Sequence, residues 1–142
     1  MRFLMLMYPG PHVDRGNGPA DGKMMAAMMK YNEELTRAGV LLSLDGLHPS
    51  ARGARITYPQ GKPNVTNGPF SGAGDIVAGF WMLQVKSRAE AVEWAKRIPV
   101  TGTEMVEVRQ VFELEEYNVD PNSALAEAVQ RVEGALPGQR NR

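Results

Sequence analysis

The chain has 142 residues, a length that suits one domain of ordinary size. Apolar residues make up 43% and charged residues 23%, which excludes a disordered or collagen-like chain. No apolar run approaches the roughly 20 residues that a membrane-spanning helix needs. Sixteen basic residues balance sixteen acidic ones, so no basic excess indicates nucleic acid. The absence of cysteine excludes thiol nucleophiles and Cys-ligated metal centres.

The first part of the chain predicts two strands around one helix. Residues 3–8 are continuously apolar, which is typical of a strand buried on both faces. Pro9 ends this run too early for a secretory signal, so we expect a cytoplasmic protein. A loop rich in Gly and Pro, residues 9–20, precedes a helix that Asp21 would cap. Residues 40–47 predict the second strand. The inner stripe of the helix would be Met24, Met28, Tyr31, Leu35 and Ala38.

The later part of the chain predicts the same order again. Residues 78–85 form a third strand, rich in apolar side chains. Ser87 and Glu90 make a capping box for a helix that ends before Pro99. Residues 104–114 alternate between apolar and polar side chains, as a half-exposed strand does.

Two segments lie outside this repeat. Residues 48–77 form a long insert rich in Gly, Pro and Asn, with one small hairpin that pairs residues 55–58 with 63–66. A short helix would begin at Pro121, and residues 137–142 would be loose. The inward side of that helix would carry Leu125, Val129 and Val132.

The order of elements predicts an α+β, ferredoxin-like βαββαβ fold with an antiparallel sheet. In this fold the first and third main strands are central, and these are the two strands that are apolar throughout. The insert lies between the second and third main strands. We assign residues 1–120 to this domain and residues 121–142 to a C-terminal helix and tail.

Both helices of this fold cover the same face of the sheet and leave the other face bare. The central strands carry large apolar side chains on both faces, and such a bare face would exceed what monomers tolerate. We therefore expect a homodimer in which two sheets pack face to face. The alternative is that the C-terminal helix or the insert covers this face within one chain.

The insert is locally positive in a neutral chain. It has no acidic residue between Asp45 and Asp75, but it carries Arg52, Arg55 and Lys62. Guanidinium groups bind carboxylates and other small anions well, so this charge predicts a pocket for a carboxylate or phenolate. The alternative is a solvated loop whose few charges share one sign.

His48 is the candidate acid–base residue, because histidine beside a carboxylate is suited to proton transfer near neutral pH. Asp45 meets it only if Gly46 bends the strand, so Asp75 or Asp14 is an equally good partner. The alternative is a structural histidine at a strand end. Metal-ligand spacing, a phosphate-binding glycine motif and a nucleophile elbow are all missing, so we expect no metal and no cofactor.

Four segments are distinctive when they are taken together: residues 44–49 (Leu-Asp-Gly-Leu-His-Pro), 67–70 (Asn-Gly-Pro-Phe), 79–87 and 93–99. They resemble the YCII-related, or DGPF-domain, family, and the similarity spans residues 1–114. The resemblance implies a dimeric α+β barrel, which the strand pattern also favours. The family's namesake Asp-Gly-Pro-Phe begins with Asn here, and an amide suits binding or turn formation better than proton transfer.

Two classes of function follow. The first is a protein that binds a small molecule. If this protein is an enzyme, we expect a lyase or isomerase that needs no cofactor. In it His48 would exchange the proton, Arg52 would hold the anion, and Asp75 or Asp45 would orient the histidine. Further binding residues would be Asn67, Phe70, Trp81 and Tyr8. The second class is a non-catalytic regulatory or interaction module, for which the resemblance implies a sigma factor as partner.

Overall fold

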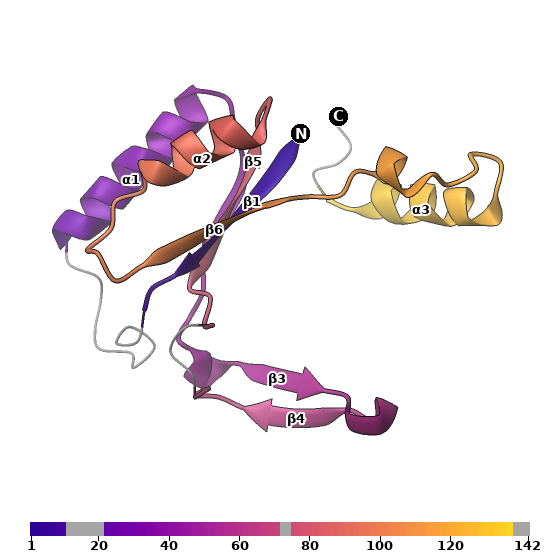
Figure 1. Ribbon diagram of the computed structural model, residues 1–142, viewed down its shortest axis with the longest axis horizontal. Coiled ribbons are helices and arrows are strands. Elements are labelled where there is room, and N and C mark those ends of the chain that lie inside the picture. Colours follow the sequence, from indigo (N-terminus) through magenta and orange to yellow (C-terminus); the bar gives the residue numbers. More distant parts are fainter. Residues whose placement is uncertain (11–21, 72–74, 138–142) are drawn as a thin grey trace. The chain divides into compact units, whose positions relative to one another are not determined.

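The structure is a computed structural model that describes residues 1–10, 22–71 and 75–137 (Figure 1). Most of the predicted loop at residues 9–20, the Asp21 cap and residues 138–142 lie outside the described part. The chain divides into two compact units, residues 1–111 and residues 112–142. The first unit holds the sheet, both of its helices and the insert.

The helices and strands follow the predicted order. They are β1 (Arg2–Tyr8), α1 (Gly22–Arg37), β2 (Leu41–Gly46), the 3-10 turn η2 (Ser50–Arg52), β3 (Ala54–Thr57), the turn η3 (Pro59–Gly61), β4 (Asn64–Asn67), β5 (Gly79–Gln84), α2 (Arg88–Lys96), β6 (Met105–Gln110), the turn η4 (Leu114–Tyr117) and α3 (Ala124–Ala135).

The main sheet confirms the predicted fold class. Its four strands run in the order β2-β5-β1-β6, and every neighbouring pair is antiparallel. The first and third main strands are therefore central, as their apolar sequences predict. Strands β3 and β4 form a separate two-stranded hairpin at the predicted place. Among the described residues, no helix combines the length and the apolar character needed to cross a bilayer.

The core lies on one face of this sheet. Strand β1 buries Phe3, Met5 and Met7 on that face, while the residues between them are half-buried on the other. Both α1 and α2 lie against the core face (Figure 1), where Leu35 and Ala91 join the same cluster of buried side chains. Each large side chain that is fully buried here contributes about 2–3 kcal/mol to folding.

Two details of the later elements differ from the predictions. Strand β6 ends at Gln110 rather than continuing to residue 114, because its partner β1 begins at Arg2, whose carbonyl accepts from the Val111 amide and ends the pairing. The side chains of Leu125 and Val132 in α3 are 59% and 62% exposed, so within residues 112–142 they are not buried as predicted. Within this helix the buried residue is Ala126.

Candidate functional site

The insert is fastened to the sheet at both of its ends. The amide of Leu47, just after β2, donates to the carbonyl of Ala78, just before β5, at 2.8 Å. The amide of Ala78 in turn donates to the carbonyl of Met7 in β1, also at 2.8 Å. These hydrogen bonds fix the base of the insert relative to the central strands.

The Asn-Gly-Pro-Phe segment closes on the turn η2. The Phe70 amide donates to the Ser50 hydroxyl oxygen at 2.9 Å, and the Gly68 amide donates to the Gly53 carbonyl at 3.0 Å. A side chain at Gly68 would collide with the backbone carbonyl of Ser50, so only glycine allows this close approach. We name these contacts of Ser50 and Gly53 with Gly68 and Phe70 the clasp.

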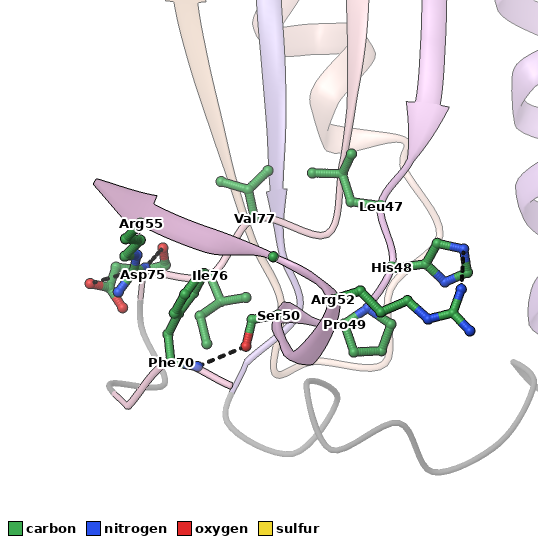
Figure 2. Close-up of a pocket in the computed structure, with 11 residues that line it drawn as sticks. Leu47, His48, Pro49, Ser50, Arg52, Arg55, Phe70, Asp75, Ile76 and Val77 are labelled. Atoms are coloured by element: carbon green, nitrogen blue, oxygen red, sulfur yellow. Dashed lines mark hydrogen bonds and ion pairs between the residues drawn. The ribbon is translucent and has the colours of Figure 1, made fainter. Parts of the chain in front are cut away.

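A cavity of about 420 Å³ lies beside the clasp (Figure 2). Its size is in the range of pockets that hold small molecules. We name it the insert pocket, because every lining residue except Leu47 belongs to the insert. Its lining residues are Leu47, His48, Pro49, Ser50, Arg52, Gly53, Arg55, Phe70, Asp75, Ile76 and Val77.

Arg55 of β3 is held at one side of the insert pocket by two neighbours. Its guanidinium carbon lies 4.2 Å from the centroid of the Phe70 ring, the geometry of a cation–π contact. Its Nη2 atom donates to the backbone carbonyl of Asp75 at 3.3 Å and lies 3.8 Å from the carboxylate of the same residue. The ion pair is too exposed to add much stability, but together the contacts orient the guanidinium group.

His48 and Arg52 form a second pair on the opposite side of the pocket (Figure 2). The Nη1 atom of Arg52 lies 3.4 Å from the Nε2 atom of His48. Arginine can only donate, so a hydrogen bond between the two side chains uses the Nε2 lone pair as its acceptor. The turn η2 causes the proximity, because it brings residues four apart in sequence to the same side of the chain.

The predicted carboxylate partners of His48 lie elsewhere. Asp75 is beside Arg55, and Asp45 is an exposed residue of β2, opposite Phe80 and outside the insert pocket. In the described part of the chain, His48 bonds to Arg52 and to no carboxylate. Acid–base pairing of His48 with Asp75 or Asp45 therefore stays a prediction, and Asp14 lies outside the described residues.

The other predicted binding residues separate into two groups. Phe70 and Arg52 line the insert pocket. Trp81 is buried in the core, Tyr8 is half-buried at the end of β1, and Asn67 is exposed at the end of β4; none of these three lines that pocket.

Sequence reasoning missed the contributions of Ser50 and the apolar wall of Ile76 and Val77. No local pattern marks Ser50, because its partner Phe70 is 20 residues away. The positive charge of the insert did indicate Arg55, but Asp75, whose backbone carbonyl and carboxylate orient it, is also 20 residues away. Within the described part of the chain, the pocket thus combines two guanidinium groups, the His48 imidazole, one carboxylate and an otherwise largely apolar lining.

Comparison with known proteins gives one family. A model of the YCII-related domain matches residues 1–115, which is most of the chain. A search of curated proteins finds no match. Within residues 1–10, 22–71 and 75–137, no three histidine or acidic side chains are grouped so that they could hold a metal ion.

Proposed function

The chain belongs to the YCII-related domain family, and from this premise we propose that the insert pocket binds a small carboxylate or phenolate with an aromatic or apolar body. One observation carries the proposal: Arg52 and Arg55 stand at opposite sides of a largely apolar cavity, and among the described residues Asp75 alone brings a carboxylate to its lining. A guanidinium group pairs with an anionic oxygen, while the apolar lining accepts the rest of the molecule.

We further propose that His48 transfers a proton in a cofactor-independent reaction of the isomerase or lyase type. Arg52 can only donate, so Nε2 turns its lone pair towards the guanidinium group, and once a bound anion engages Arg52 this lone pair is free to act as a general base. A base here would take a proton from a carbon next to a carbonyl group. The Arg52 guanidinium would then stabilise the negative charge that develops on the carbonyl oxygen.

Binding is tested with phenylpyruvate, which combines a carboxylate, a ring and an acidic C–H bond. We expect it to shift the NMR signals of the Ser50 and Phe70 amides. Arg52→Gln and Arg55→Gln should each weaken binding about tenfold, because each variant removes a charge-assisted hydrogen bond of about 1.5 kcal/mol. Arg97→Gln is the matched control, since Arg97 stacks 3.7 Å from the Trp94 ring centroid and away from the insert pocket.

Two results would contradict the binding proposal. One is unchanged affinity in both pocket variants. The other is equal affinity for phenylacetone, which has the same ring and ketone but no carboxylate.

Proton transfer is tested on the same probe. In deuterated water, we expect the protein to accelerate deuterium incorporation at the benzylic carbon of phenylpyruvate. His48→Gln should remove this acceleration while the Ser50 and Phe70 amide signals still respond to the probe. Exchange that continues unchanged in His48→Gln would overturn the role of His48. Binding without any acceleration would favour the non-catalytic module.

We also propose that the protein acts as a homodimer through the face of the sheet that α1 and α2 leave uncovered. Half-buried apolar side chains occupy the middle of this face: Leu4, Leu6, Phe80 and Met82. Glu107 and Arg109 flank them on β6, with 3.6 Å between carboxylate and guanidinium atoms. A face that carries both charges beside an apolar centre is complementary to a second copy of itself related by two-fold symmetry.

A further inference from the structure

A second cavity, of about 190 Å³, lies between α1 and the ends of three strands of the main sheet. It shares no lining residue with the insert pocket. We name it the helix-side cavity. Its lining residues are Met7, Met28, Asn32, Leu44, Asp45, Gly46, Ala78, Gly79, Phe80 and Trp81.

The helix-side cavity exists because two glycines face each other in the sheet. Gly46 of β2 pairs with Gly79 of β5. Two residues away along each strand, Leu44 pairs with Trp81, and these are the last large side chains on the helix-covered face of the sheet. Side chains two residues apart on a strand share a face, so both glycines lie on the side that α1 covers. Two side chains are therefore missing from the layer between α1 and the sheet.

The two glycines differ in what they are needed for. A Cβ atom at Gly79 would lie 3.0 Å from the carbonyl oxygen of Asp45, so the close approach of the strands explains this glycine. A Cβ atom at Gly46 would meet no atom within 4 Å, and the backbone of Gly46 is not left-handed. Neither conformation nor crowding requires glycine at position 46. Gly46 is itself exposed, so what it provides is open space at the mouth of the cavity.

One polar side chain of the cavity has a fixed orientation. The indole Nε1 of Trp81 lies 2.9 Å from the Oδ1 atom of Asn32. An indole nitrogen can only donate, so Asn32 accepts with its oxygen and keeps both N–H groups of its amide as donors. Trp81 is itself held by an edge-to-face contact with Tyr31, whose ring centroid is 6.1 Å away. The donor is thus set in place before any ligand arrives.

Charge and size limit what the cavity can take. Asp45 pairs with Phe80, one residue out of phase with Trp81, so its side chain belongs to the opposite face of the sheet. A neutral ligand is therefore favoured, in contrast to the insert pocket. A closed cavity of roughly 150 Å³ in another protein holds benzene, so about 190 Å³ here, in a cavity that is open to solvent at Gly46, has room for one six-membered ring with a short substituent. The flexible, polarisable side chains of Met7 and Met28 can adapt to such a ring.

We propose that the helix-side cavity is a separate binding site for a small neutral aromatic or alicyclic carbonyl compound. The ring fills the space that Gly46 and Gly79 leave, and the carbonyl oxygen accepts a hydrogen bond from the Asn32 amide. This site is independent of the anionic ligand proposed for the insert pocket.

The test uses acetophenone and the Nε1–H signals of the two tryptophans in the NMR spectrum. Acetophenone should shift the signal of Trp81 and leave that of Trp94 in place, because only Trp81 lines the cavity. Gly46→Val should weaken binding at least tenfold by filling the space. Gly134→Val is the control, since this exposed glycine of α3 also has no atom near its Cβ position. Gly46→Ala, a smaller addition, should give an intermediate loss.

The hydrogen bond is tested separately with Asn32→Asp. This variant keeps an acceptor for Trp81 but removes the donor, so acetophenone should bind about tenfold more weakly. Ethylbenzene, which has the ring and no carbonyl, should be unaffected by the change. The proposal is overturned if acetophenone fails to shift Trp81, if Gly46→Val binds it normally, or if Asn32→Asp weakens both probes equally. Phenylpyruvate binding at Ser50 and Phe70 should survive Gly46→Val, so failure at one site is distinguishable from failure at the other.

Discussion

Glu104 organises the turn that leads into β6. Its carboxylate accepts hydrogen bonds from the Thr101 hydroxyl at 2.7 Å, from the Thr101 amide at 3.0 Å and from the Gly102 amide at 2.9 Å. Burial alone would raise the pKa of Glu104. The hydrogen bonds from Thr101 and Gly102 outweigh it and lower the pKa from the ordinary value of 4.5 to about 2.

This lowered pKa makes part of the folding stability depend on pH. A carboxylate with a lower pKa in the folded state stabilises the fold above its unfolded pKa, and the contribution disappears as the pH falls through the folded value. We therefore expect Glu104→Gln to have a lower free energy of unfolding than the unaltered protein at pH 7. The difference in free energy between the two proteins should become smaller as the pH falls from about 5 to about 2. Urea unfolding of both proteins at several pH values measures this difference, and Glu133→Gln in α3 is the control. A difference that is constant with pH would contradict the role of Glu104.

The sequence placed His48 and Arg52 in one candidate site, but it predicted neither their mutual contact nor the contacts between distant residues. His48 and Arg52 are four residues apart, so a single turn brings them together. Arg55 and Asp75 are 20 residues apart, and nothing near either residue indicates that they meet. Ser50 and Phe70 are separated by the same distance in the chain. Contacts of this kind depend on how the whole insert folds, which the residue pattern does not encode locally.

At the scale of elements, Tyr31 joins the two helices that cover the sheet. Its hydroxyl in α1 donates to the carbonyl of Trp94 in α2 at 2.7 Å. Burial raises the pKa of Tyr31 well above its ordinary value of 10, so the hydroxyl remains a donor over the whole range in which the protein would be handled. The hydrogen bond between Tyr31 and Trp94 thus links two residues that are 63 positions apart in the chain.

We expect Tyr31→Phe to lower the free energy of unfolding by about 1 kcal/mol, because the Trp94 carbonyl loses one of its two donors in a partly buried place and keeps only the Arg97 amide. Chemical denaturation followed by circular dichroism measures the change. Tyr58→Phe is the matched control: Tyr58 is 66% exposed in the turn between β3 and β4, so its change should stay within about 0.5 kcal/mol. Equal stability of the two variants would show that the hydrogen bond between the helices adds nothing.

Element boundaries depend on partners as much as on patterns. The alternation that predicts a strand over residues 104–114 continues past Gln110, but β1 has no residue left to pair with it beyond the bond from the Val111 amide to the Arg2 carbonyl. The stripe of α3 has the spacing of a helix, yet most of its apolar side chains stay exposed within residues 112–142. Periodicity predicts that an element forms, and its surroundings decide where it ends and what it buries.

At the scale of the whole molecule, the central strands made the fold predictable. Strands that are apolar on both faces belong in the middle of a sheet, and this criterion alone selects β1 and β5. The same strands also carry apolar side chains, such as Leu6 and Met82, on the face of the sheet opposite the helices, and α1 and α2 do not cover this face. The proposed cover for this face, a second copy of the chain, has a direct test.

We expect a molar mass of twice 15.6 kDa by light scattering coupled to size-exclusion chromatography. Leu6→Lys and Met82→Lys should each shift the protein towards the monomer, because either change places a charge in the middle of the apolar face. Met25→Lys is the control, since Met25 is 52% exposed on α1 and away from the sheet. A mass of 15.6 kDa for the unaltered protein would contradict the dimer.

The clasp has a consequence for how this chain can vary. Gly53 and Gly68 bond to each other through their backbones, so the segment between them leaves and returns at one point. The part of this segment that lies farther from the clasp than the pair Arg55 and Thr66, residues 56–65, contributes no lining residue to the insert pocket. We therefore expect that the length and sequence of residues 56–65, the outer part of the β3–β4 hairpin, can change without moving the walls of the insert pocket. Evolution can diversify this outer part freely, and an engineer can graft a peptide there.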